Sequence, residues 1–161
     1  MLKRVDDFLS SVEEKILVFL SAIALVVFTV QIINRLFIGI PMAWTDEVSR
    51  FDLVWIVCIS AAYGMKKGFH IGVDAFVNML PAKASRVIRF VTLLACLAFA
   101  FSLTIAAWKL CALQFKHPQL TPILSLPMLY NYIVMLIGAL LMDFHIFANI
   151  VYYFKNETAV N

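Results

Sequence analysis

The sequence predicts an all-α integral membrane protein with four transmembrane helices, and two observations carry this prediction. Four apolar stretches, separated by short charged loops, take up nearly all of the 161 residues, and 63% of the residues are hydrophobic. The mean hydropathy of +0.93 excludes a soluble globular domain, because a soluble surface needs more polar residues than remain. We expect residues 1–161 to form a single membrane domain.

Three of the four stretches are long uncharged runs. Residues 16–34 and 90–108 are each free of charged side chains, and so is the longer run 118–142. A helix of ~20 apolar residues matches the ~30 Å hydrocarbon core of a bilayer. Each of these runs is therefore long enough to span a membrane.

The second stretch is uncharged only over 53–65, which is short for a span. A helix that begins at Thr45 or Asp46 and ends near Lys67 would still reach across. The four spans expected from the sequence lie at about 15–36, 46–67, 86–113 and 125–152.

Lysine and arginine residues predict the orientation. Alternate loops fall on opposite sides of the membrane, so the N-terminus, the second loop and the C-terminus form one group, with Lys3, Arg4, Lys15, Lys66, Lys67, Lys83, Arg86, Arg89 and Lys155. The other group has Arg35, Arg50, Lys109 and Lys116. Because basic residues concentrate on the cytoplasmic side, both termini are expected in the cytoplasm. No basic patch interleaved with aromatic residues points to nucleic acid.

Two shorter segments have the pattern of amphipathic helices that lie on the membrane surface. In the first, apolar residues recur at three- and four-residue intervals with charged residues between them: Leu2, Val5, Phe8, Leu9, Val12 and Ile16. The second repeats the pattern in the second loop, with Val73, Phe76, Val77 and Leu80 before Pro81. The alternative is that both segments are solvated turns that extend the spanning helices.

The loop before the second span is the most distinctive polar region. Trp44 favours a headgroup interface, and Thr45 can cap a helix whose first turn holds two carboxylates. Arg50 follows at helical spacing, within reach of either carboxylate. This pattern is typical of a capped helix start with a surface ion pair, or of a polar docking patch for a partner. Asp52, close to the interface, would need a partner if it were buried. The candidate patch consists of Trp44, Asp46, Glu47, Arg50 and Asp52.

Small residues recur every four positions at the end of the second span. They are Ser60, Gly64, Gly68 and Gly72. This interval lets two helix backbones approach closely in lipid, where packing drives association. The alternative is that Gly68 and Gly72 only end the helix.

The motif W-T-D-E-V-S-R at 44–50, followed by K-K-G-F-H-I-G-V-D at 66–74 and L-P at 80–81, resembles the small membrane subunit of tripartite ATP-independent periplasmic (TRAP) transporters. The length, the four spans and the order of tryptophan, acidic residue and arginine before the second span are similar as well. The positions that correspond to the family's characteristic residues are Trp44, Glu47, Arg50, Gly68, His70 and Asp74.

The resemblance implies a subunit that scaffolds a larger transport subunit in the bacterial inner membrane. The large multi-span subunit would carry substrate and sodium, and a periplasmic binding protein would deliver the substrate. An organic acid such as sialic acid or a C4-dicarboxylate is the implied substrate class. This chain would then contact lipids and the large subunit, and would hold no cofactor, metal or substrate itself.

Two other classes of membrane protein are alternatives. A haem-binding anchor of a respiratory enzyme needs histidines inside facing helices, whereas His70 and His117 are in loops and His145 is near the end of the last span. A small autonomous exporter needs a carboxylate inside a span, and Asp52 and Asp143 are expected too near the ends.

No residue set predicts catalysis, so an enzyme is not expected. Cys58, Cys96 and Cys111 have neither the pairing nor the spacing of disulfide or zinc sites, and we interpret them as packing residues.

Overall fold

The structure, a computed structural model, describes residues 2–40, 42–67 and 82–158. Within these ranges the chain forms helices and no strand: α1 (Leu2–Ile33), the π-helix η1 (Asn34–Ile38), α2 (Ala43–Lys67), α4 (Ala82–Lys116) and α5 (Leu129–Thr158). Four helices are long and apolar enough to cross a membrane, which confirms the predicted all-α membrane class. The second predicted interfacial helix lies outside the described residues.

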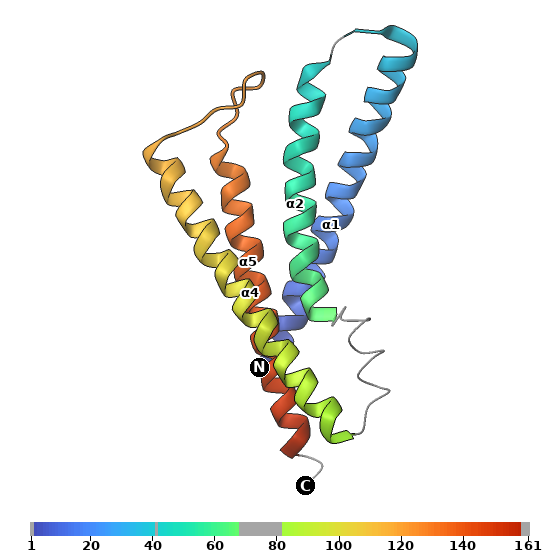
Figure 1. Cartoon of the computed structure of the whole chain (residues 1–161). Coiled ribbons are helices and arrows are strands. Elements are labelled where there is room, and N and C mark those ends of the chain that lie inside the picture. Colours follow the sequence, from blue (N-terminus) through green and yellow to red (C-terminus); the bar gives the residue numbers. More distant parts are fainter. Residues whose placement is uncertain (1, 41, 68–81, 159–161) are drawn as a thin grey trace.

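The helices run up and down, so that the connections lie at two ends of the bundle (Figure 1). We call the end with residues 34–40 and 117–128 the loop end. The opposite end, where α1 begins, α2 ends, α4 begins and α5 ends, is the terminal end. The pair α1–α2 and the pair α4–α5 spread apart at the loop end and come together toward the terminal end (Figure 1). Helix α2 packs on both α1 and α5, and α4 packs on α5.

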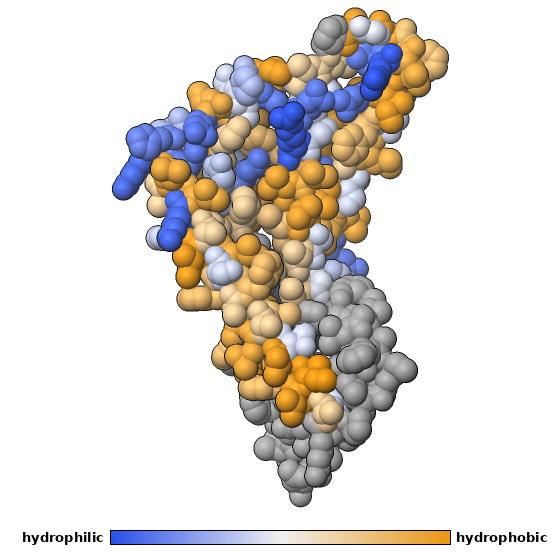
Figure 2. All heavy atoms as spheres, in the orientation of Figure 1, coloured by the Kyte–Doolittle hydropathy of each residue, from blue (hydrophilic) through white to orange (hydrophobic). Residues whose placement is uncertain are grey.

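The buried apolar core is small and lies where the two pairs meet. Ala62 of α2, Ala100 of α4, and Met142 and Ile146 of α5 form one cluster. Large apolar side chains elsewhere point outward, and Figure 2 shows them covering the middle of one face, with hydrophilic residues gathered toward the loop end. This distribution suits a helix bundle whose surroundings are lipid.

Helices α2 and α5 are in close contact at Gly138. A Cβ atom added there would lie 2.9 Å from the carbonyl oxygen of Cys58. Side-chain hydrogen bonds flank this contact: the Trp55 indole N–H donates to Asn131 at 3.0 Å, and the Asn149 amide donates to the carbonyl of Met65 at 2.9 Å. A small residue therefore brings two helices together at Gly138, a position that the sequence analysis did not single out.

The first predicted interfacial helix is not a separate element. Residues 2–33 form one continuous helix, so the amphipathic segment is the first part of α1. Its apolar residues Val5 and Phe8 are exposed, whereas Asp6, Ser10 and Glu13 are buried. The polar stripe thus faces the other helices rather than water, because it has charged partners on α2 and α5.

The start of α2 also differs from the prediction. The helix begins at Ala43, and Thr45 is fully buried with its hydroxyl donating to the carbonyl of Met42 at 2.6 Å. Thr45 therefore does not cap the helix, because its hydroxyl is turned back toward the carbonyl of Met42, three residues earlier. At the end of the first span, η1 closes on Gly39, which has a φ of 69°. Glycine adopts this left-handed conformation without strain.

Candidate partner interface

Glu47, at the loop end, is used inside the chain. Its side chain is buried, and its two carboxylate oxygens accept the backbone N–H groups of Ile123 at 2.8 Å and Leu124 at 2.9 Å. The same loop is closed on itself by Thr121, whose hydroxyl oxygen accepts the N–H of Leu126 at 3.0 Å. Glu47 therefore fixes loop 117–128 on the first turns of α2, since charge-assisted bonds to N–H groups are strong.

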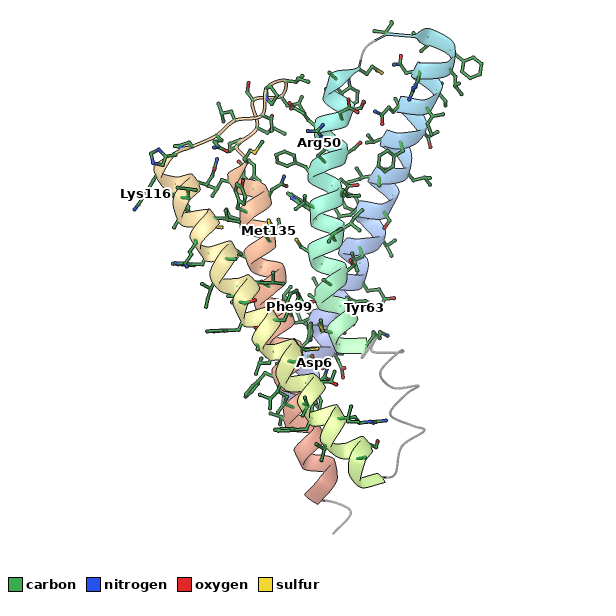
Figure 3. The ribbon with its side chains drawn as sticks, viewed as in Figure 1. Asp6, Arg50, Tyr63, Phe99, Lys116 and Met135 are labelled. Carbon is green, nitrogen blue, oxygen red and sulfur yellow. The ribbon has the colours of Figure 1, made fainter. Side chains whose placement is uncertain are left out.

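The rest of the predicted patch divides between internal and outward-facing groups. Asp46 accepts a hydrogen bond from the Gln31 side chain of α1 at 2.6 Å. Within the described ranges, neither carboxylate forms an ion pair with Arg50. Arg50 is exposed at the loop end (Figure 3), and Trp44 is 41% exposed. Trp44, Asp46 and Arg50 are therefore the exposed members of the patch, and Asp46 is already hydrogen-bonded to α1.

Asp52 differs from the other patch residues because it is buried without a partner. Its side chain is 7% exposed, and Oδ1 is enclosed with no hydrogen bond. It lines an apolar groove of ≈ 370 Å³ whose other walls are Leu20, Ile23, Val48, Phe51, Trp55, Leu126 and Tyr130. Asp52 is thus buried, which is the case in which the sequence analysis required a partner, and no group of the described chain provides one.

The small-residue ladder is only partly described. Ser60 is exposed and its hydroxyl donates to the carbonyl of Val57 at 3.1 Å, and Gly64 is half-buried. The remaining predicted residues, Gly68, His70, Gly72 and Asp74, lie outside the described residues. A close helix contact along this ladder stays a prediction.

A buried charged cluster at the terminal end was not predicted. His145 of α5 is fully buried, with Nδ1 2.6 Å from Asp6 Oδ1 and Nε2 3.0 Å from Glu13 Oε1. The ammonium of Lys66, on α2, lies 3.2 Å from Asp6 Oδ2 and 2.8 Å from Asp7 Oδ1. We call Asp6, Glu13, Lys66 and His145 the terminal cluster; Asp6 is seen in Figure 3 near the crossing of the helices.

The geometry of the terminal cluster constrains its protons. A neutral imidazole has one N–H group, so it can donate to only one of the two carboxylates. Hydrogen bonds at both ring nitrogens require an imidazolium or a protonated carboxyl group. With an imidazolium, the two carboxylates and two cations sum to zero charge, which suits burial. Both ring nitrogens of His145 are then engaged, so neither is free to bind a haem iron.

This cluster joins residues that are 132 and 139 positions apart, which is why spacing alone did not find it. A local signal was present in the stripe of Asp6, Ser10 and Glu13, which share one face of α1. On α5, His145, Asn149 and Tyr152 make a similar stripe. Polar stripes on two apolar helices favour contact between them.

Asp143 links α5 to α4 through one of its two carboxylate oxygens. It belongs to the candidate span Leu129–Tyr152 and accepts a hydrogen bond from the Thr104 hydroxyl of α4 at 2.7 Å. Its other oxygen, Oδ1, is buried without a partner. Asp52 likewise lies within the candidate span Ala43–Lys67. In the part of the chain that the structure describes, no group of three or more His, Cys, Asp or Glu side chains is arranged to hold a metal ion.

These features define an integral membrane protein of four helices whose described polar side chains mainly join its own helices and loops. Comparison with known proteins identifies the family. Residues 16–156 match the family described as tripartite ATP-independent periplasmic transporters, DctQ component, and the chain belongs to that family. The match confirms the resemblance found in the sequence motifs.

Curated relatives carry names from the same family. The C4-dicarboxylate TRAP transporter small permease protein DctQ of Vibrio cholerae is 34% identical over 119 residues, which cover 73% of this chain and 49% of the relative. The sialic acid TRAP transporter small permease protein SiaQ of the same organism is 31% identical over 83 residues, 52% of this chain and 48% of the relative. The isethionate TRAP transporter permease protein DctMQ of Oleidesulfovibrio alaskensis is 27% identical over 92 residues, 57% of this chain and 14% of that protein. The matched part of the chain spans half or less of the length of each of these relatives.

Proposed function

We propose that this chain is the small permease subunit of a TRAP transporter in a bacterial inner membrane, and that it scaffolds a large membrane subunit. The observation that carries the proposal is the family match over residues 16–156, which includes nearly all of the four membrane helices. Most of the described carboxylates and amides of these helices, and His145, form hydrogen bonds with other groups of the same chain. A chain of this kind contributes packing surface and orientation rather than a transport path.

The partners and substrate follow from the relatives. A relative named DctMQ, of which the match covers only 14%, supports association with a larger permease partner. The names of the relatives support an organic acid as substrate, of the C4-dicarboxylate, sialic acid or a similar class. A periplasmic binding protein would deliver it, and sodium coupling would reside in the large subunit.

Transport assays in proteoliposomes test the proposal. The subunit alone should show no sodium-driven uptake of any organic acid, and uptake should require a large multi-span subunit and a periplasmic binding protein. Uptake by the isolated subunit would contradict the scaffold and favour the autonomous exporter. A haem absorbance band in the purified protein would favour the respiratory anchor instead.

The proposed orientation places the terminal end in the cytoplasm, because nine basic residues lie there against four on the other side. Arg50 is exposed at the loop end, so Arg50→Cys on a background without the three native cysteines should react with an impermeant thiol reagent from the periplasmic side. Reaction only after the membrane is broken would reverse the orientation.

In this proposal fewer residues of the docking patch contact a partner than the sequence suggested. Reversing the charge of Asp46 or Glu47 would break internal hydrogen bonds, so lost assembly in such variants would not identify an interface. Trp44 and Arg50 are the exposed patch residues whose substitution breaks none of these hydrogen bonds, and Ser60 and Gly64 begin a second candidate contact along the small-residue ladder. Gly68, His70, Gly72 and Asp74 complete the proposed contact surface.

A further inference from the structure

We propose that the groove lined by Asp52 seats one apolar membrane helix of the large subunit, and that this helix presents an arginine or lysine to the Asp52 carboxylate. The inference rests on the proposed function, because it names the face by which this subunit binds its partner. It goes beyond that function by assigning the surface, the contacting residue and the chemistry of the partner.

The groove lies on three elements that diverge toward the loop end. Helix α1 contributes Leu20 and Ile23, α2 contributes Asp52 and Trp55, and α5 contributes Tyr130. The helix pairs spread apart at this end of the bundle (Figure 1), which leaves a groove of ≈ 370 Å³ with an apolar wall. A helix with apolar side chains fills such a groove by van der Waals packing, which drives helix association in lipid.

Asp52 is the unusual feature of this wall. Among the carboxyl groups whose side chains the structure describes, Asp52 is the one with neither a hydrogen bond nor an ion pair. The residue as a whole is 93% buried, since 7% is exposed, and the enclosed carboxylate oxygen is Oδ1. Asp52 follows the interfacial Trp44 by eight residues, which places it about 12 Å farther along the helix axis. A carboxylate at that depth needs a partner, because lipid offers it none.

The unpaired carboxylate decides between the possible occupants. A lipid acyl chain would fill the groove but would donate no hydrogen bond. A second copy of this chain would bring another carboxylate or, from residues 16–30, uncharged side chains to the same depth. A cationic side chain on a partner helix satisfies both the apolar wall and the charge, since a buried ion pair with hydrogen bonds replaces lost hydration.

Two single substitutions of Asp52 test the contact. Asp52→Asn and Asp52→Leu should weaken binding to the large subunit by about 30-fold or more in lipid nanodiscs, as expected when one member of a buried charge pair is removed. The thermal midpoint of the isolated subunit should not fall, because Asp52 has no internal partner to lose. Asp143→Asn is the matched control: it also carries a buried unpaired oxygen, but it faces α4, so binding should stay within about twofold. Equal binding of Asp52→Asn and wild type would overturn the inference.

A photo-crosslinking residue in place of Ile23 identifies the occupant. Cross-links from this groove position should reach the large subunit, whereas the same residue in place of Leu113, which is 55% exposed on α4, should not. Cross-links to lipid or to a second copy would overturn the inference. Uptake measured with the same preparations distinguishes failure of this inference from failure of the proposed function. Intact transport without a cross-link from position 23 would contradict the proposed contact but not the proposed function.

Discussion

The terminal end and the loop end both bury carboxylates between apolar helices, but they provide them with different partners. At the terminal end Asp6 and Glu13 meet the Lys66 ammonium and the ring nitrogens of His145 within the chain. At the loop end Glu47 meets two backbone N–H groups, and Asp52 meets no group of the described chain. Burial is similar at both ends, so the difference lies in how completely the charge is balanced.

This difference suggests distinct roles for the two ends. The terminal cluster ties α1 and α2 to α5 across the bundle, and its four buried charges cancel when His145 is an imidazolium, while Asp7 is exposed beside Lys66. The loop end holds its helices apart and leaves a carboxylate unpaired in an apolar groove. A balanced, closed end suits internal stability, whereas an unbalanced, open end suits a contact that another subunit completes.

The largest effect is expected in the terminal cluster. Replacing His145 by Leu leaves two buried carboxylates with one remaining cation, which should destabilise the isolated subunit by about 3–5 kcal/mol. Thermal unfolding in detergent measures the loss. Asp52→Asn serves as the control from the other end and should cause no loss, because it breaks no internal bond.

A combined variant sharpens this result. His145→Leu together with Asp6→Asn and Glu13→Gln removes most of the buried charge at once, and it should recover most of the stability that His145→Leu loses. A triple variant no more stable than the single one would show that the cluster acts through shape rather than through charge balance.

A smaller effect is expected at Glu47. Glu47→Ala removes both acceptors for Ile123 and Leu124 and should cost about 2 kcal/mol, since two buried N–H groups lose their partner. Hydrogen exchange should rise at these two amides while the terminal end keeps its protection. Exchange that rises equally at both ends would mean that the loop is coupled to the whole bundle.

The contact between α2 and α5 can be weakened without touching a charge. Gly138→Ala places a methyl group 2.9 Å from the Cys58 carbonyl oxygen and should destabilise the subunit by about 1–3 kcal/mol through overpacking. Gly64→Ala, in the half-buried part of the predicted ladder, is the comparison variant. If the ladder serves a partner, Gly64→Ala should lower complex recovery more than it lowers the stability of the isolated subunit.

Much of the fold could be predicted from the sequence, because spans depend on the length and composition of single segments. The hydropathy pattern predicted the four spans, and the motifs at 44–50 and 66–74 pointed to the family. The sequence pattern singled out the polar residues at 44–52, but the hydrogen bonds that they form inside the chain could not be foreseen. Glu47 binds N–H groups 76 and 77 positions away, in a loop whose conformation no local pattern specifies.

The terminal cluster was missed for a related reason. The stripe of Asp6, Ser10 and Glu13 fits a surface helix as well as it fits a buried one, because periodicity shows which residues share a face but not what covers that face. Whether the stripe is buried depends on its partner on α5, His145. The position of His145 relative to the stripe depends in turn on how α1 crosses the bundle. The same ambiguity explains why the first part of α1 was expected on the membrane surface.

The smallest expected effect concerns Asp143, which lies between the two ends and resembles both. One of its oxygens accepts a hydrogen bond from Thr104, as the carboxylates of the terminal cluster have partners, and the other is unpaired, as at Asp52. Thr104→Val keeps the shape of the side chain and removes the hydroxyl donor. Asp143 would then be, like Asp52, a buried carboxyl group without a hydrogen-bond partner. Hydrogen bonds between membrane helices are worth about 0.6 kcal/mol on average, and the loss of stability should be of that size. Unfolding of the isolated subunit at several denaturant concentrations can resolve such a change, with Ser102→Ala as a control because Ser102 is exposed and bonds only within its own helix. A loss above about 2 kcal/mol would instead place Asp143 with the terminal cluster, as a carboxylate whose charge must be balanced inside the chain.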